Sequence, residues 1–190
     1  MAPDMAGLVT AAKAGDRQAF EELVRATYTD AYTLAYRLTG NEEDASDVVQ
    51  EAYLRAFKSL KRFRGDAQFS TWLYRIVANC AATALGKRAK NRHETLDDDA
   101  PLADLRPDYD PDARLDASVE RERVTEALRE LPDGLRQVVV LRDVYDLPHE
   151  AIAKELGISE AAAKVRLHRA RRRLRERLFP LRGEEAARAV

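Results

Sequence analysis

The sequence predicts an all-α protein with two helical domains joined by an acidic linker. Three observations support this prediction. Apolar residues recur at the spacing of a helix in both parts of the chain, and no alternation of the kind that strands show persists anywhere. Proline and acidic residues break the helical pattern between the two parts. The abundant alanine, leucine and arginine residues also favour helices.

Three long helices are predicted in the first half of the chain. Asp16 is a good N-cap for the first helix, which Gly40 ends, and Asn41 is the N-cap of the second. The third helix is expected from about Ser70 to the basic cluster that ends at Lys90. The apolar stripe of the first helix is Phe20, Leu23, Val24, Tyr28, Ala31, Ala35 and Leu38, and that of the second is Ala45, Val48, Val49, Ala52, Tyr53 or Leu54, Phe57 and Leu60.

The helical pattern dissolves in the middle of the chain. This stretch holds Pro101, Pro107 and Pro111 and little apolar surface, so it cannot fold alone. We therefore expect a helical domain over residues 1–90, a flexible acidic linker over 91–117, a second helical domain over 118–179 and a disordered tail over 180–190.

The overall net charge of −1 conceals a strong separation of charge along the chain. The stretch from Glu94 to Asp116 holds nine acidic residues against two arginines, a net charge of −7. From Pro148 to Arg182 the net charge is +6. This pattern predicts a polyanion-binding C-terminal end that follows an acidic connector.

The sequence offers no candidate for catalytic chemistry. A single cysteine, Cys80, excludes an internal disulfide and a paired-cysteine metal site, and we expect it to pack inside a helix bundle. The histidines His93, His149 and His168 are dispersed. We therefore expect a binding protein that is not an enzyme and needs no cofactor. No apolar stretch approaches the roughly 20 residues of a membrane-spanning helix, and no signal peptide is visible, so a cytoplasmic protein without membrane insertion is expected.

The segment from His149 to Arg169 predicts a helix-turn-helix. A small residue, a glycine able to turn, and an apolar anchor follow one another as Ala153, Gly157 and Ala163, as this motif requires. The second helix has the apolar stripe Ala163, Leu167, Ala170, Leu174 and Leu178, and its other face is basic. A solvated basic helix is the alternative. We expect the helix to enter the major groove of DNA, with Arg169 placed to pair with guanine.

Three further segments carry a family resemblance. Residues 44–57, 63–79 and 131–142 resemble, in order, the polymerase-binding helix, the minus-10 reader and the start of the minus-35 reader of sigma factors. With the helix-turn-helix, they make the chain similar to the extracytoplasmic-function (ECF) group over roughly Leu8–Leu178.

The resemblance implies a subunit that directs core RNA polymerase to promoters and initiates transcription. Its implied partners are core RNA polymerase (β′ clamp and β subunit), promoter DNA and an anti-sigma factor. The implied polymerase-binding residues are Asp44, Asp47, Val48, Gln50 and Glu51. Those for the minus-10 element are Arg64, Asp66, Trp72, Arg75 and Asn79, and those for the minus-35 element are Lys164, Val165, Arg166, His168, Arg169, Arg171 and Arg172.

Several alternatives stay open at this point. Trp72 fits a core position as well as a base-stacking one, the acidic face around Asp47 fits plain solvation, and the linker fits a simple tether. Arg75 and Ile76 stand where housekeeping sigma factors carry a tryptophan pair that separates the strands, so weaker melting is expected. The rival prediction is a dimeric helix-turn-helix regulator that binds operators without joining polymerase, for which the sequence shows no dimerisation domain.

Overall fold

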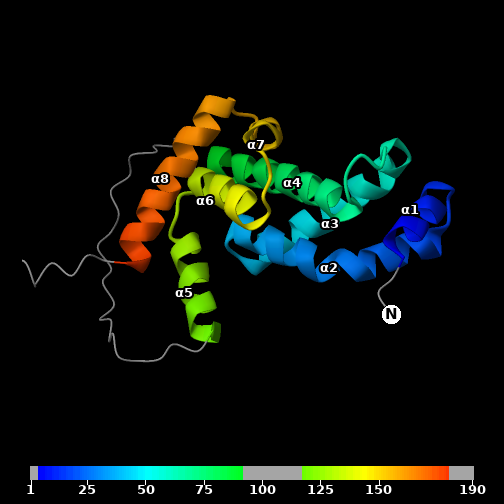
Figure 1. Ribbon diagram of the computed structural model, residues 1–190, viewed down its shortest axis with the longest axis horizontal. Coiled ribbons are helices and arrows are strands. Elements are labelled where there is room, and N and C mark those ends of the chain that lie inside the picture. The colour runs from blue at the N-terminus through cyan, green and yellow to red at the C-terminus, as the bar shows by residue number, and fades with distance from the viewer. Residues whose placement is uncertain (1–3, 92–116, 180–190) are drawn as a thin grey trace, which may run out of the picture.

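The computed structural model describes residues 4–91 and 117–179, here called the N-terminal half and the C-terminal half (Figure 1). Both halves are helical, and neither described range contains a strand, which confirms the predicted all-α class. In chain order the elements are α1 (Met5–Lys13), α2 (Arg17–Thr39), α3 (Glu42–Ser59), the 3-10 turn η1 (Leu60–Arg62), α4 (Phe69–Asn91), α5 (Ala117–Arg129), α6 (Asp133–Val139), the π-helical turn η2 (Val140–Val144), α7 (His149–Leu156) and α8 (Glu160–Leu178).

The expected linker and tail lie outside the described residues, except at the linker's ends. Asn91 still belongs to α4, and Ala117 already belongs to α5.

The helix caps of α2 and α3 are those that the sequence predicted. The Asp16 carboxylate accepts hydrogen bonds from the Gln18 and Ala19 amides at 2.9 and 3.2 Å, and α2 ends where Gly40 takes φ of 80°. Asn41 caps α3 by accepting from the Asp44 amide at 2.8 Å. The predicted caps are therefore confirmed. They could be predicted because each cap depends only on a few neighbouring residues.

Helix α1 was not predicted. It is nine residues long and buries only Ala12, so it lacks the long apolar stripe by which the other helices were found. Asp4 caps it by accepting from the Gly7 amide at 3.1 Å.

The apolar stripe of α3 differs from the predicted one. Tyr53, not Leu54, faces the core, where its hydroxyl lies 2.9 Å from the hydroxyl of buried Thr27. Leu54 and Phe57 are half-exposed, at 50% and 51%, so the prediction that Phe57 lies in the core was wrong. Phe57 instead packs edge-on against Phe20 with ring centroids 5.0 Å apart.

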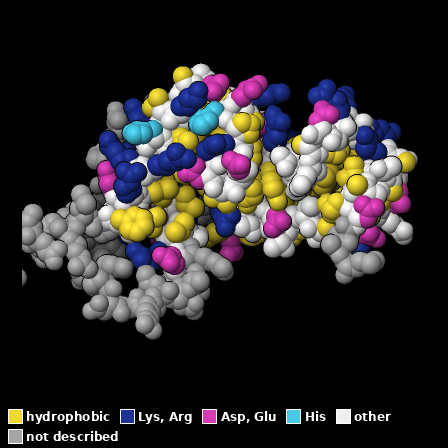
Figure 2. All heavy atoms as spheres, in the orientation of Figure 1, with side chains coloured by type: hydrophobic (Ala, Val, Ile, Leu, Met, Phe, Trp, Pro, Cys, Tyr) yellow, Lys and Arg dark blue, Asp and Glu magenta, His cyan; other side chains and the backbone are white. Residues whose placement is uncertain are grey.

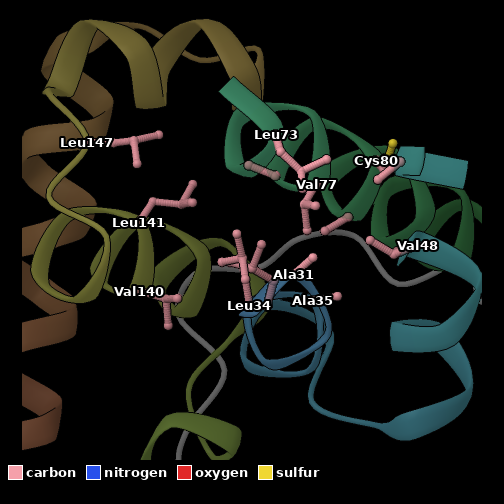
Figure 3. Packing of buried hydrophobic residues seen from close by; sticks show 14 of the residues in the cluster. Ala31, Leu34, Ala35, Val48, Leu73, Val77, Cys80, Val140, Leu141 and Leu147 are labelled. Atoms are coloured by element: carbon pink, nitrogen blue, oxygen red, sulfur yellow. The ribbon is translucent and has the colours of Figure 1, made fainter. Parts of the chain in front are cut away.

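The two halves share one hydrophobic cluster instead of standing apart on a tether. Helices α6 and α7 pack against α2 and α4 (Figure 1). Figure 3 shows Leu34 of α2 and Val77 of α4 facing Val140 and Leu141 of η2 across this boundary. Leu34 and Leu141 are completely buried. The closed arrangement therefore removes apolar surface of both halves from water.

The helix-turn-helix forms as predicted from α7 and α8. Ala153 and Ala163 are buried where the helices touch, and Gly157 takes the left-handed conformation at φ of 66°. Ser159 caps α8 by accepting from the Ala162 amide at 3.1 Å. The predicted stripe of α8 is buried as far as Ala170 and becomes partly exposed beyond it.

Cys80 is expected to be unreactive in the native chain. It is buried in α4, and burial raises the pKa of its thiol to about 11, whereas an unfolded cysteine titrates near pH ~8.5. The thiol therefore stays protonated until the pH approaches that raised pKa, and only the thiolate is a nucleophile. At about pH 8, iodoacetamide should alkylate the native chain at least roughly tenfold more slowly than the urea-unfolded chain, as followed by mass spectrometry. Equal rates would contradict this burial.

Candidate nucleic-acid interface

The exposed face of α8 brings together four of the residues implied in minus-35 recognition. Figure 2 shows Lys, Arg and His side chains gathered over α7 and α8. Lys164, Val165, His168 and Arg169 are all exposed there, and Val165 is 52% exposed despite its apolar side chain. Buried residues anchor the opposite face of α8. Such a basic face with an exposed methyl-bearing side chain fits phosphates, guanine edges and thymine methyls.

Three further basic residues of α8 are engaged within the protein, and on the exposed face Lys164 pairs with Glu160 at 2.9 Å. Arg171 makes a two-pronged contact with Asp143, with N···O distances of 2.6 and 3.0 Å, and this contact raises the pKa of Arg171. Arg172 lies 3.5 Å from Glu176 one turn on. Arg166 is partly buried against Gly134, where a side chain would come within 3.1 Å of its guanidinium. These three residues are thus turned toward the C-terminal half or paired along α8.

The loop before α4 leads into an aromatic cluster. The Trp72 ring lies 5.0 Å from that of Phe63 and 5.7 Å from that of Phe69, between centroids. Phe63 and Phe69 are buried, whereas Trp72 is partly exposed, so it both packs on the core and keeps one surface open. In the loop, Arg64 and Asp66 form an exposed ion pair at 3.0 Å.

Two residues implied in minus-10 reading, Arg75 and Asn79, are covered by the C-terminal half. The Arg75 Nε lies 3.2 Å from a carboxylate oxygen of Glu155, near the end of α7. The Asn79 amide nitrogen donates to the backbone carbonyl of Glu155 at 3.3 Å, and its oxygen accepts from Arg55 at 3.0 Å. In this arrangement their polar groups already have partners.

A second contact between the halves centres on Arg136 of α6, which sequence reasoning did not single out. Its guanidinium is buried and donates to the carbonyls of Leu38 and Thr39 at 3.2 and 3.1 Å. Arg129 donates to the next carbonyl, that of Gly40, at 3.2 Å. The last carbonyls of a helix have no partner within it, so arginines of the C-terminal half satisfy the end of α2.

Arg136 is also held within its own half. It donates to the carbonyls of Arg129 and Leu131 and to the carboxylate of Asp133. Burial lowers the pKa of Arg136, and Asp133 opposes that effect. Its position, between Leu135 and Gln137 just before the apolar run Val138–Leu141, was the only sequence signal.

Aromatic packing also joins the two halves. The rings of Tyr74 in α4 and Tyr145 after η2 meet edge to face with centroids 5.0 Å apart. Burial, reinforced by Asp30, raises the pKa of Tyr74 to about 12. Burial also raises the pKa of Tyr145. The boundary therefore combines apolar and aromatic packing with two sets of polar contacts.

The α3 surface divides the five residues implied in polymerase binding. Asp47, Gln50 and Glu51 are exposed together, whereas Val48 is buried in the core. The Asp44 carboxylate is bound by Arg88 at 2.6 Å and by the side-chain amide of Asn41 at 2.7 Å.

Phe57 was assigned to the core stripe, with Leu54 as an alternative to Tyr53, so both were missed as surface candidates. Leu54 and Phe57 follow Asp47 and Gln50 at intervals of seven residues, which places them on the same side of the helix. That seven-residue spacing was the available signal.

Two other features were sought in the described residues, a metal site and a membrane-spanning helix. Within residues 4–91 and 117–179, no group of three or more His, Cys, Asp or Glu side chains is placed to hold a metal ion. The same ranges contain no helix that combines the length and the apolar character needed to span a bilayer.

Family models match a segment in each half of the chain. The family model for Sigma-70 region 2 matches residues 23–91, and that for Sigma-70, region 4 matches residues 121–174.

Among solved structures, the chain resembles the sigma factor RpoE of Bartonella quintana in complex with the anti-sigma factor NepR. The TM-score is 0.59 at 22% identity, over 86% of this chain and 98% of that one, which supports the fold alone. It also resembles CnrH in complex with the cytosolic domain of CnrY, with a TM-score of 0.56 at 28% identity over 92% and 96% of the two chains.

Curated relatives match over most of their length. The chain is 38% identical to the ECF RNA polymerase sigma factor SigM of Mycobacterium tuberculosis, over 89% of this chain and 82% of that one. It is 36% identical to SigE of Mycolicibacterium smegmatis over 90% and 67% of the two chains. It is 33% identical to SigW of Bacillus subtilis over 89% and 94%. The chain therefore belongs to the extracytoplasmic-function family of RNA polymerase sigma factors.

Proposed function

We propose that this chain directs core RNA polymerase to promoters, with α8 reading the minus-35 element and the start of α4 reading the minus-10 element. One observation carries the proposal. A single chain presents a basic recognition helix in a helix-turn-helix and, in its other half, an aromatic cluster with a cation and an amide beside it. The first suits duplex DNA and the second suits unpaired bases.

For the minus-35 element, the proposed base-reading residues are Lys164, Val165, His168 and Arg169. They are exposed on one face of α8, and Arg169 has no ion pair among the described residues, so its five donors are available to guanine or phosphate. Arg166, Arg171 and Arg172 are proposed to contribute positive charge near the DNA backbone.

For the minus-10 element, partly exposed Trp72 is proposed to stack on an unpaired base, while Arg75 and Asn79 bind its backbone and edge. Arg64 and Asp66 form the proposed loop beside it. These assignments require α7 to move away from Arg75 and Asn79.

Docking on polymerase is proposed for the exposed face of α3. Asp47, Gln50 and Glu51 supply polar contacts, and Leu54 and Phe57 supply the apolar surface that dominates binding energy in most interfaces. Asp44, held by Arg88, and buried Val48 would support this helix from behind. The expected site of action is the cytoplasm. An anti-sigma partner is proposed because the similar sigma factors RpoE and CnrH were solved in complexes, RpoE with its anti-sigma factor NepR and CnrH with the cytosolic domain of CnrY.

Reconstituted transcription tests the proposal. Core RNA polymerase with the purified chain should initiate from promoters selected out of a random library, whereas core alone should not. Operator binding by a dimer of the free chain, with no gain in initiation, would favour the rival regulator instead.

Arg169→Ala and Lys164→Ala are expected to impair minus-35 recognition and to leave core polymerase binding intact. A good base contact is worth about 1–3 kcal/mol, so the affinity of the holoenzyme for a selected promoter should fall accordingly. Arg175→Ala removes an exposed arginine from the same helix outside the proposed contacts and serves as the control. Unchanged promoter selectivity in both variants would rule out the assignment of this face.

Leu54→Asp is expected to weaken binding to core polymerase by roughly tenfold or more, because it places a charge in a proposed apolar contact. The side chain is half-exposed, so the thermal unfolding of the free chain should change little. The control Gln18→Glu adds a negative charge at an exposed position of α2, outside the proposed docking face. Equal core affinity for the wild type and Leu54→Asp would place the docking surface elsewhere.

A further inference from the structure

The end of α7 covers the part of α4 that is proposed to read unpaired DNA. Glu155 meets Arg75 through its carboxylate at 3.2 Å and Asn79 through its backbone carbonyl at 3.3 Å. The Glu155 side chain is largely buried, at 15% exposed, whereas Arg75 keeps 40% of its side chain exposed. This contact is therefore an ordered part of the boundary between the halves.

Glu155 presents the same chemistry as a nucleotide at this position. A carboxylate oxygen on a guanidinium N–H is equivalent to a phosphate oxygen there, since arginine binds both through charge-assisted hydrogen bonds. A backbone carbonyl that accepts from an asparagine amide is equivalent to a carbonyl of a base edge. One residue thus supplies both an anionic oxygen and a neutral acceptor.

We propose that Glu155 is an internal competitor of the unpaired promoter strand, so that the closed chain and the strand-bound chain exclude each other. The inference rests on the proposed minus-10 role of Arg75 and Asn79. It adds that Glu155 occupies their hydrogen-bonding groups in the free protein. The Arg75 Nε–H and the Asn79 amide cannot donate fully to Glu155 and to a DNA strand at the same time.

Contacts at the end of α2 also hold the two halves together. Arg136 and Arg129 bind the last carbonyls of α2, and the buried Leu141 of η2 and Leu147 of the loop before α7 belong to the shared cluster. Weakening these contacts should open the closed form even though they involve none of the proposed strand-reading residues. Because the apparent affinity of a site scales with the fraction of molecules in which it is accessible, opening should raise strand affinity.

The experiment measures binding of the free full-length chain to a labelled single-stranded oligonucleotide of about 12 random nucleotides, by fluorescence anisotropy. Small-angle scattering of the same samples reports whether the halves have separated. Glu155→Lys repels Arg75 and should raise strand affinity by roughly fivefold or more, with an expanded particle. Glu150→Lys makes the same charge change at an exposed position of α7, so it measures the effect of charge alone.

Arg129→Ala provides an independent arm. It removes a positive charge, which by itself should weaken DNA binding, yet it also removes the hydrogen bond to Gly40 and should therefore raise strand affinity. Arg25→Ala, which removes an exposed arginine of α2, should lower affinity slightly or leave it unchanged.

The outcomes separate the competitor from the proposed function. Strand affinity that rises in Glu155→Lys no more than in Glu150→Lys, together with no rise in Arg129→Ala, would overturn the competitor role. The minus-10 assignment is tested apart from it, by Arg75→Ala in the assembled holoenzyme. Loss of open-complex formation there, with no gain from Glu155→Lys in the free chain, would leave the proposed function intact and the competitor wrong. Full open-complex formation by Arg75→Ala would count against the minus-10 assignment, and the competitor would fall with it.

Discussion

Helix ends that lack partners within their own helix organise this protein. The carbonyls of Leu38, Thr39 and Gly40 at the end of α2 are satisfied by two arginines of the C-terminal half. The carbonyl of Glu155 near the end of α7 is satisfied by Asn79 of the N-terminal half. A buried carbonyl without a hydrogen-bond donor is costly, and each half donates to carbonyls at a helix end of the other half. These hydrogen bonds help to fix how α6 and α7 lie on α2 and α4.

Arg136 suits a boundary that can open. Its guanidinium makes five hydrogen bonds, of which those to Arg129, Leu131 and Asp133 stay within the C-terminal half. Separation of the halves would break only the two bonds to α2 and would admit water to both sides. The apolar centre around Leu34 and Leu141 opposes opening, so the closed form is stable without being locked.

Features that depend only on residues close together in the sequence could be predicted, and features that depend on tertiary packing could not. The caps Asp16 and Asn41 and the turn at Gly157 were predicted because each needs only its neighbours along the chain. Helix α1 was missed because it is short and owes its place to packing against α2.

The candidate sites divide in the same way. The exposed face of α8 followed from periodicity, whereas the cover over Arg75 and Asn79 depends on a residue about 80 positions away, as the hydrogen bond from Arg75 to Glu155 shows. Neither composition nor periodicity holds information on such a contact. The family resemblance supplied the sites but not the arrangement of the halves.

The carboxylates around α8 change what its many arginines can contribute to DNA binding. Asp143 binds Arg171 and Glu130 binds Arg177, each through two oxygens, in the C-terminal part of α8. Arginines neutralised in this way displace few cations from the phosphate backbone, and the release of such counterions sets how steeply affinity falls with salt. The number of counterions released by this domain should therefore be smaller than its count of basic residues, with Arg171 contributing less than an unpaired arginine would.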